Sequence, residues 1–173
     1  MARRASDLEW ILCDVDGVLT DGGLFYTRWG PLAIRFHVRD GLALKLAQQA
    51  GLKVGLLSGR ATAAVDRRAT ELKLDAVHLG VDDKADELES FVEHHHTAAH
   101  RIAYIGDDLP DIVVLAKCGL SFAPADAAPE VKTVVHTVLS ASGGQGAARE
   151  MIEVILRARG VWEDLFSRFT LDG

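Results

Sequence analysis

Short apolar runs alternate with longer amphipathic stretches along most of the chain. Five of the runs are typical of buried strands, and they span residues 10–15, 54–57, 76–79, 102–105 and 120–123. The stretches between and after them suit helices, at residues 42–50, 61–72, 84–95, 109–116 and 147–159. This alternation predicts an α/β fold, a Rossmann-like parallel sheet with helices on both faces.

One segment does not follow this alternation of strands and helices. Residues 24–26 and 32–38 are apolar arms around Trp29-Gly30-Pro31, a sequence typical of a turn between antiparallel strands. Side chains in the second arm are expected to alternate between an apolar and a polar face, with Ile34, Phe36 and Val38 opposite Arg35, His37 and Arg39. We expect a hairpin over about residues 23–39 that projects from the sheet, and subunit association that covers its apolar surface.

The bulk properties limit the classes of function. The 173 residues suit a single domain over 1–173, and the net charge of −6 comes without a basic tract for a nucleic acid partner. No apolar run approaches the roughly 20 residues of a membrane span, and acidic residues interrupt any leader, so we expect no membrane association and a cytoplasmic location. Cys13 and Cys118 lie in apolar stretches and are expected to be buried free thiols.

Polar and glycine-rich segments follow four of the predicted strands. These segments are residues 14–22, 58–60, 80–84 and 106–111. Ligands of open α/β sheets bind beyond the carboxyl ends of the strands, so the four segments should converge on one site. They would bring together carboxylates, a hydroxyl group, an amine and exposed backbone amides.

This set of groups suits phosphoryl transfer. Asp14 and Asp107 offer carboxylate oxygens, the ligands that Mg²⁺ prefers. The metal and Lys84 would together keep Asp14 ionised by lowering its pKa, and an ionised carboxylate is a competent covalent nucleophile. Asp16 would point the same way as Asp14 and protonate the leaving oxygen.

Residues 58–60 would bind the substrate. Ser58 and the backbone amides around Gly59 would donate hydrogen bonds to the transferring phosphoryl group. Arg60 and Arg68 are further candidates for substrate binding, although Arg68 equally suits a solvated helix face. Asp108 and Asp111 suit orienting their loop or capping the helix that follows.

In chain order, these residues resemble the four motifs of the haloacid dehalogenase superfamily phosphatases. The matching positions are Asp14-Val15-Asp16-Gly17, Ser58-Gly59-Arg60, Lys84 and Gly106-Asp107-Asp108. The chain also resembles the 3-deoxy-D-manno-octulosonate 8-phosphate phosphatases of that superfamily, from about residue 10 to 159. This closer resemblance rests on residues 14–22, 36–41, 104–109 and 143–150.

The resemblance implies a core without a large cap domain, a Mg²⁺ cofactor, and a homotetramer assembled partly through the hairpin. It implies that Asp14, Asp107 and the main-chain carbonyl of Asp16 hold the metal. Neighbouring subunits would complete each active site, which makes Arg39 a candidate contact for the carboxylate of a sugar acid. Arg60 stands where phosphatases of the nine-carbon sugar acid tend to carry Glu, so it favours the eight-carbon substrate and a role in lipopolysaccharide biosynthesis.

Two alternatives remain open at this stage. The same chemistry would serve a nine-carbon keto-deoxy sugar acid 9-phosphate or a range of small phosphate esters. A protein of another class, a non-catalytic regulatory or assembly module, would have no need of the clustered like charges of Asp14, Asp16 and Asp107.

Overall fold

The computed structural model describes residues 2–28 and 30–170, which are built around a parallel sheet of six strands. Their spatial order is β5-β4-β1-β6-β7-β8, with the bounds β1 Trp10–Cys13, β4 Lys53–Ser58, β5 Ala76–Leu79, β6 Ile102–Ile105, β7 Leu120–Ala123 and β8 Thr137–Val138. Five of these strands match the predicted apolar runs, and β8 has only two residues and therefore no pattern to detect. The predicted α/β fold with a parallel sheet is confirmed.

Strand β1 lies in the interior of the sheet, and the chain extends the sheet from it in both directions. Leu12 of β1 pairs with Gly55 of β4 on one side and with Tyr104 of β6 on the other. The strand order reverses beside β1, and ligands of open α/β sheets bind at such a reversal, beyond the carboxyl ends. The segments that follow β1, β4 and β6 are therefore placed to form a site.

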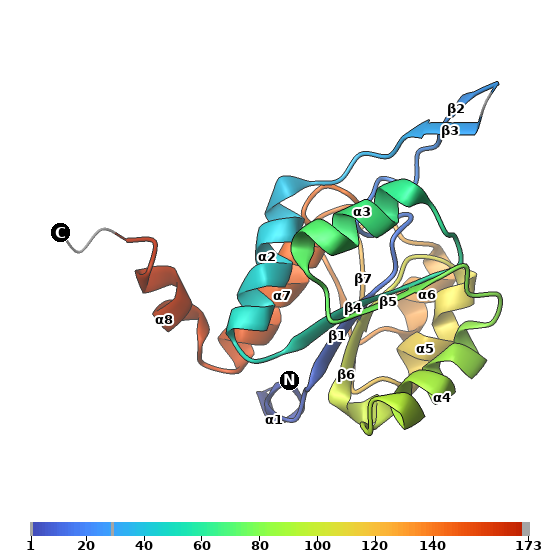
Figure 1. Ribbon diagram of the computed structural model, residues 1–173. Helices are drawn as coiled ribbons and strands as arrows, with labels where there is room; N and C mark the ends of the chain where they lie inside the picture. The colour runs from blue at the N-terminus through green and yellow to red at the C-terminus, as the bar shows by residue number, and fades with distance from the viewer. Residues whose placement is uncertain (1, 29, 171–173) are drawn as a thin grey trace.

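Helices cover both faces of the sheet (Figure 1). One face carries α1 Ala2–Ser6, α2 Val38–Gln49, α3 Ala63–Leu72, α7 Ala147–Ala158 and α8 Trp162–Ser167, and the other carries α4 Lys84–His94, α5 Ile112–Lys117 and α6 Pro129–Val134. Successive strand residues point to opposite faces, so Ile105 packs in the first core and Tyr104 in the second. Because both faces are buried, the interior strands β1 and β6 are apolar and buried throughout.

Strands β2 Phe25–Thr27 and β3 Gly30–Ala33 form an antiparallel hairpin that projects from the body (Figure 1). The hairpin is shorter than the predicted span of 23–39. Gly30 and Pro31 belong to β3 and not to the turn, while Trp29 lies outside the described residues. Among the described residues, these two strands are the only elements between β1 and α2, so the expected lack of a large cap domain is confirmed.

The predicted alternation of faces along residues 34–39 is wrong. These residues are not part of the hairpin, and α2 begins at Val38, which places Arg39 in the first turn of a helix. The helix starts early because its first turn packs against α7, where Asp40 accepts a hydrogen bond from the N–H of Arg149 at 2.8 Å. That tertiary contact is invisible in the local sequence pattern.

The predicted helix at 109–116 divides into two parts. A 3₁₀ turn, Leu109–Asp111, precedes α5, and a second 3₁₀ turn, Ala99–Arg101, precedes β6. Pro110 fits the first turn because no helical partner is needed for its missing N–H there. Within residues 2–28 and 30–170, no helix has the length and apolar character needed to cross a membrane.

Candidate active site

Asp14 directly follows β1 and lies at the carboxyl edge of the sheet. Its backbone N–H donates to the carbonyl oxygen of Ile105 at 3.0 Å, which extends the pairing with β6 by one residue. The chain then turns sharply, and the carbonyl of Val15 accepts from the N–H groups of Val18, Leu19 and Thr20. The turn holds the Asp14 side chain, which is 10% exposed, against a cavity.

Glycines allow two other segments to approach this turn closely. Gly17 has φ +79°, and a Cβ added there would lie 2.0 Å from Oδ2 of Asp107. A Cβ added to Gly143 would lie 1.9 Å from the carbonyl oxygen of Gly17, and the N–H of Gly144 donates to the carbonyl of Val18 at 2.9 Å. The segment before α7 therefore packs directly on the loop that follows Asp14.

Lys84 brings a positive charge to Asp14 from α4. The helix begins at Lys84 because the side chain of Asp83 accepts from the N–H groups of Ala85 and Asp86 and caps the first turn. Nζ of Lys84 donates to Oδ1 of Asp14 at 2.9 Å and to Oδ1 of Asp111 at 2.6 Å. Burial alone would lower the pKa of Lys84, but the charges of the two carboxylates outweigh it and raise that pKa.

Asp111 connects Lys84 to the loop that carries Asp107. Its Oδ1 accepts from Lys84 and from the hydroxyl group of Tyr104, and its Oδ2 accepts from the N–H groups of Asp107 at 3.0 Å and Asp108 at 3.2 Å. A Cβ at Gly106 would lie 2.4 Å from the Asp111 carboxyl carbon, so only glycine fits beneath it. Asp111 thus orients the loop, one of the two roles expected for it.

Three carboxylates are crowded at this edge. Asp14, Asp107 and Asp111 each place an oxygen within 4.8 Å of the others. Burial and the charge of Asp111 raise the pKa of Asp14 to about 6, although Lys84 acts to lower it. Burial and the charges of Asp14 and Asp111 raise the pKa of Asp107 to about 7. The lowered pKa predicted for Asp14 presumed a metal as well as Lys84, and Lys84 alone does not offset this crowding.

The donor set fits a divalent cation. Hard carboxylate oxygens are what Mg²⁺ prefers, and its charge would remove the repulsion that raises the two pKa values. Both oxygens of Asp111 already accept two hydrogen bonds each. Asp14 and Asp107 are therefore the carboxylates best placed to hold the ion, in agreement with the donor types expected from the sequence.

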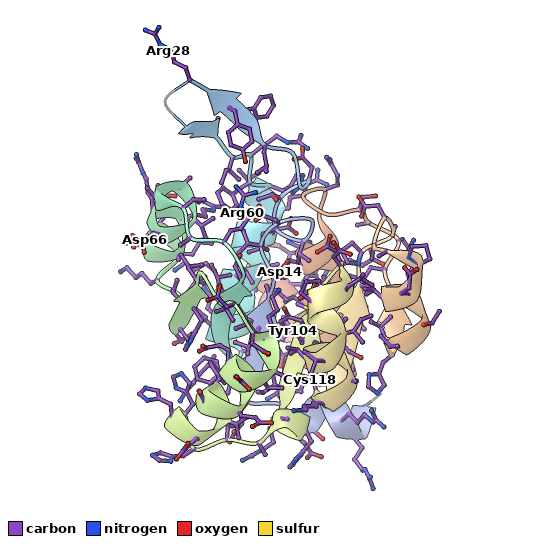
Figure 2. The ribbon with its side chains drawn as sticks, turned by 90° about the vertical axis from the view of Figure 1, so that its right-hand side faces the viewer. Asp14, Arg28, Arg60, Asp66, Tyr104 and Cys118 are labelled. Carbon is purple, nitrogen blue, oxygen red and sulfur yellow. The ribbon has the colours of Figure 1, made fainter. Side chains whose placement is uncertain are left out.

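The site opens into a cavity of about 440 Å³ at the carboxyl edge of the sheet. The predicted site residues that line it are Asp14, Asp16, Ser58, Gly59, Arg60, Lys84 and Asp107. Figure 2 shows Asp14 between Arg60 on one side and Tyr104 on the other. Ser58 ends β4, and its hydroxyl oxygen accepts from the N–H of Arg60 at 3.3 Å. The fold thus gathers residues from four distant segments around one space.

Arg60 and Asp16 form an accessible ion pair at this cavity. Nε of Arg60 lies 3.5 Å from Oδ2 of Asp16, and the two side chains are 38% and 27% exposed. An ion pair in contact with water contributes little to stability. Both groups are therefore accessible to a ligand in the cavity, the guanidinium group to an anion and the carboxyl group to a proton transfer.

Arg39 and Arg68 do not line the cavity. Arg39 is exposed in the first turn of α2. The guanidinium group of Arg68 fills the space above Gly41, 2.2 Å from where a Cβ would lie, and its central carbon is 5.9 Å from the centre of the Phe36 ring. Arg68 therefore packs over the first turn of α2 and the residues just before it.

Tyr104 belongs to the site, although its sequence context did not single it out. Its hydroxyl group donates to Oδ1 of Asp111 at 2.6 Å and accepts from Nζ of Lys84 at 3.2 Å. Burial, with the charge of Asp111, raises the pKa of Tyr104 well above its usual value, so the hydroxyl group stays protonated. The available signal was its place at the start of segment 104–109, one of those on which the family resemblance rests, two residues before Gly106.

Comparisons with known proteins agree with this geometry. Residues 77–151 match the family model of the haloacid dehalogenase-like hydrolases. The 3-deoxy-D-manno-octulosonate 8-phosphate phosphatase KdsC of Haemophilus influenzae is 42% identical over 160 residues, which cover 92% of this chain and 89% of that protein. The enzyme of the same name from Yersinia pestis is 34% identical over 157 residues, with coverage of 91% and 84%.

Solved structures extend the likeness to the whole fold. The phosphatase of this name from Moraxella catarrhalis, crystallised with a magnesium ion, a phosphate ion and KDO, superposes with a TM-score of 0.94 and 32% identity, covering 98% of this chain and 97% of that one. The cobalt-bound Haemophilus influenzae phosphatase superposes with a TM-score of 0.89 and 40% identity, covering 95% of this chain and 99% of that one. Fold and site together define a phosphatase of the haloacid dehalogenase-like class. Within it, the chain belongs to the family of the 3-deoxy-D-manno-octulosonate 8-phosphate phosphatases.

Proposed function

We propose that this chain hydrolyses 3-deoxy-D-manno-octulosonate 8-phosphate with Mg²⁺ as cofactor, through a phosphoryl group carried on Asp14. The observation that carries the proposal is the buried pair of Asp14 and Lys84, 2.9 Å apart, at the floor of a cavity shared with Asp107. The names of relatives that match this chain over nearly its whole length supply the substrate.

The reaction would proceed in two displacements. In the first, a carboxylate oxygen of Asp14 bonds to phosphorus while the bond to the sugar oxygen breaks, and Asp16 gives that oxygen its proton. In the second, Asp16 takes a proton from water, the water oxygen bonds to phosphorus, and the bond to Asp14 breaks. Inorganic phosphate leaves, and both carboxyl groups return to their starting states.

The other residues of the cavity would hold the phosphoryl group and the sugar acid. Lys84, the Ser58 hydroxyl group and the amides around Gly59 would donate hydrogen bonds to the phosphoryl oxygens. Arg60 would bind an anionic or hydroxyl group of the sugar. Mg²⁺, held by Asp14, Asp107 and the main-chain carbonyl of Asp16, would neutralise the charge of the phosphoryl group.

The assembly of the protein is part of the same proposal. Phe25 and Tyr26 on the hairpin are 63% and 65% exposed, which is unusual for large apolar side chains and favours burial between copies of this chain. A cytoplasmic homotetramer with active sites near the interfaces would also bring Arg39 or Arg68 of one copy toward another. Sedimentation of the wild type and of Phe25→Asp would test this, and a monomeric wild type would contradict it.

Phosphate release from a panel of substrates tests the activity. The panel consists of the eight-carbon sugar acid phosphate, the nine-carbon one and simple sugar phosphates, each with Mg²⁺ and with a chelator. A kcat/KM preference of more than about tenfold for the eight-carbon compound, lost with the chelator, is the expected result. Equal activity on all would contradict the substrate, and no activity on any would favour a regulatory or assembly module.

A further inference from the structure

The ammonium group of Lys84 is surrounded by three hydrogen-bond acceptors. Asp111 Oδ1 lies at 2.6 Å, Asp14 Oδ1 at 2.9 Å and the Tyr104 hydroxyl oxygen at 3.2 Å. An ammonium group has three protons, so each of them has a partner. The side chain of Lys84 is 6% exposed, so water does not replace any of these partners cheaply.

The direction of each hydrogen bond follows from the chemistry of the groups. The single proton of the Tyr104 hydroxyl group points to Asp111 Oδ1 at 2.6 Å, which leaves the hydroxyl lone pairs facing Lys84. Asp111 Oδ2 is held by two backbone N–H groups of the loop. These hydrogen bonds fix the orientation of the Tyr104 hydroxyl group and of the Asp111 carboxylate.

Only one of the three partners of Lys84 changes during the reaction proposed above. Asp14 loses its negative charge when it takes up the phosphoryl group, so its hydrogen bond to Lys84 weakens and that proton becomes available to the phosphoryl oxygens. Tyr104 and Asp111 do not react. We propose that Tyr104 is a positioning residue, which with Asp111 holds the Lys84 ammonium group in place while its third hydrogen bond passes from Asp14 to the phosphoryl group.

The fold explains why a tyrosine at this place is suited to the task. Tyr104 is in β6, beside β1 in the sheet, and its side chain points to the face covered by α4, the helix that begins at Lys84. It lies beneath the site in Figure 2, fully buried in the apolar core of that face. Phenylalanine would fill almost the same space without the oxygen, so Tyr104→Phe separates positioning from packing.

Steady-state kinetics of Tyr104→Phe with para-nitrophenyl phosphate and Mg²⁺ provide the first test. We expect kcat to fall about tenfold, because a small misplacement of a charged group affects the transition state more than ground-state binding. KM and the half-saturating Mg²⁺ concentration should stay within about twofold. Phe91→Leu is the matched control on the same face of the sheet, since it should lower Tm without lowering kcat.

A second measurement does not depend on activity. The Lys84 ammonium protons should exchange slowly with water in ¹⁵N nuclear magnetic resonance spectra of the wild type, in a signal absent from Lys84→Arg. In Tyr104→Phe that exchange should be at least about tenfold faster, because one proton has lost its buried acceptor.

The two experiments separate this inference from the proposed function on which it rests. An inactive wild type would refute the proposed function, and unchanged Lys84 exchange in Tyr104→Phe would still refute the positioning. An active wild type with kcat of Tyr104→Phe within twofold of it would overturn the inference alone. A rise in KM at constant kcat would also overturn it, because Tyr104 would then affect ground-state binding.

Discussion

Nζ of Lys84 lies 2.9 Å from Oδ1 of Asp14, although seventy residues separate them in the chain. Lys84 opens a helix on one face of the sheet, and Asp14 directly follows an interior strand. Both side chains are almost fully buried, so the pair forms in a region where charge interactions are strong and unpaired charges are costly. The predictions below follow from this pair and its surroundings.

Asp14→Asn should abolish turnover while leaving the fold intact. The amide is not a competent nucleophile, so we expect kcat to fall by at least about 10³-fold. Because Asp14 is one of three crowded carboxylates, its neutralisation should leave Tm equal to the wild-type value or raise it. Phosphate release and a thermal melt measure the two effects, and activity near that of the wild type would refute covalent catalysis.

Gly17→Ala should damage the metal site. A Cβ at this position would lie 2.0 Å from Oδ2 of Asp107, so the carboxylate would have to move. Gly51→Ala is a matched control, since Gly51 has φ +82° and nothing within 4 Å of an added Cβ. Both variants should lose about 1 kcal/mol of stability from backbone strain, and only Gly17→Ala should need more than about tenfold more Mg²⁺ for activity. Equal Mg²⁺ requirements would contradict this.

Without metal, the crowded carboxylates should make the protein more stable in mild acid. The pKa values of Asp14 and Asp107 are raised to about 6 and about 7 from an ordinary value of 3.8, so the folded state binds protons that the unfolded state releases. The stability contributed by these groups is fully present below about pH 4 and is lost as pH rises through 6 and 7. In a chelator, Tm should therefore rise as pH is lowered from about 8 to about 5.5.

Mg²⁺ should reverse this dependence, since the ion requires both carboxylates in their ionised forms. Its affinity should fall by up to roughly tenfold per pH unit between pH 7 and 6, where Asp107 becomes protonated, and by up to roughly a hundredfold per unit below 6, where Asp14 does too. Asp107→Asn is the control, and its metal-free Tm should vary less over the same pH range than that of the wild type. A Tm that falls on acidification equally in the two metal-free proteins would refute this account.

Asp40→Ala should destabilise the contact between α2 and α7. Asp40 is 2% exposed, and its Oδ1 accepts from the N–H of Arg149, in the first turn of a helix whose N-cap, Gly146, has no side chain to do so. Asp40→Ala should lower the free energy of unfolding by about 1–2 kcal/mol. Asp40→Asn keeps a hydrogen-bond acceptor and should lower it by less than about 0.5 kcal/mol. Urea unfolding measures both, and equal losses would show that the hydrogen bond is unimportant.

The parts of the site that were predictable follow strands with clear boundaries. Asp14, Ser58 and Asp107 each come after an apolar run, and parallel strands bring their carboxyl ends to one edge whatever their order along the chain. Lys84 was predictable because it opens the helix that follows the apolar run at residues 76–79. Arg39 was misplaced on a hairpin because apolar and polar residues alternate at 34–39, and that local pattern also fits the start of a helix that packs on α7.

Tyr104 and Asp111 show what the pattern could not reveal. Each has an ordinary explanation in sequence, as a strand aromatic and as a loop or cap residue. Their arrangement depends on two short hydrogen bonds to Oδ1 of Asp111. One comes from Lys84 at 2.6 Å, 27 residues away in the chain, and the other from Tyr104 at 2.6 Å, across the turn after β6. Such contacts depend on the packing of α4 against β6 and on the turn after β6, and neither is encoded in residue spacing.

By itself, the sequence determined the class of fold, the edge of the sheet at which the site lies, and the chemical groups that the site contains. These follow from hydrophobic periodicity and residue type, which act locally. Only the tertiary structure decided that Lys84 is shared by Asp14, Asp111 and Tyr104, that Arg68 packs away from the cavity, and that Asp40 caps α7. The physical reason is that these relations are set by distances between distant segments, which close packing fixes only once the chain is folded.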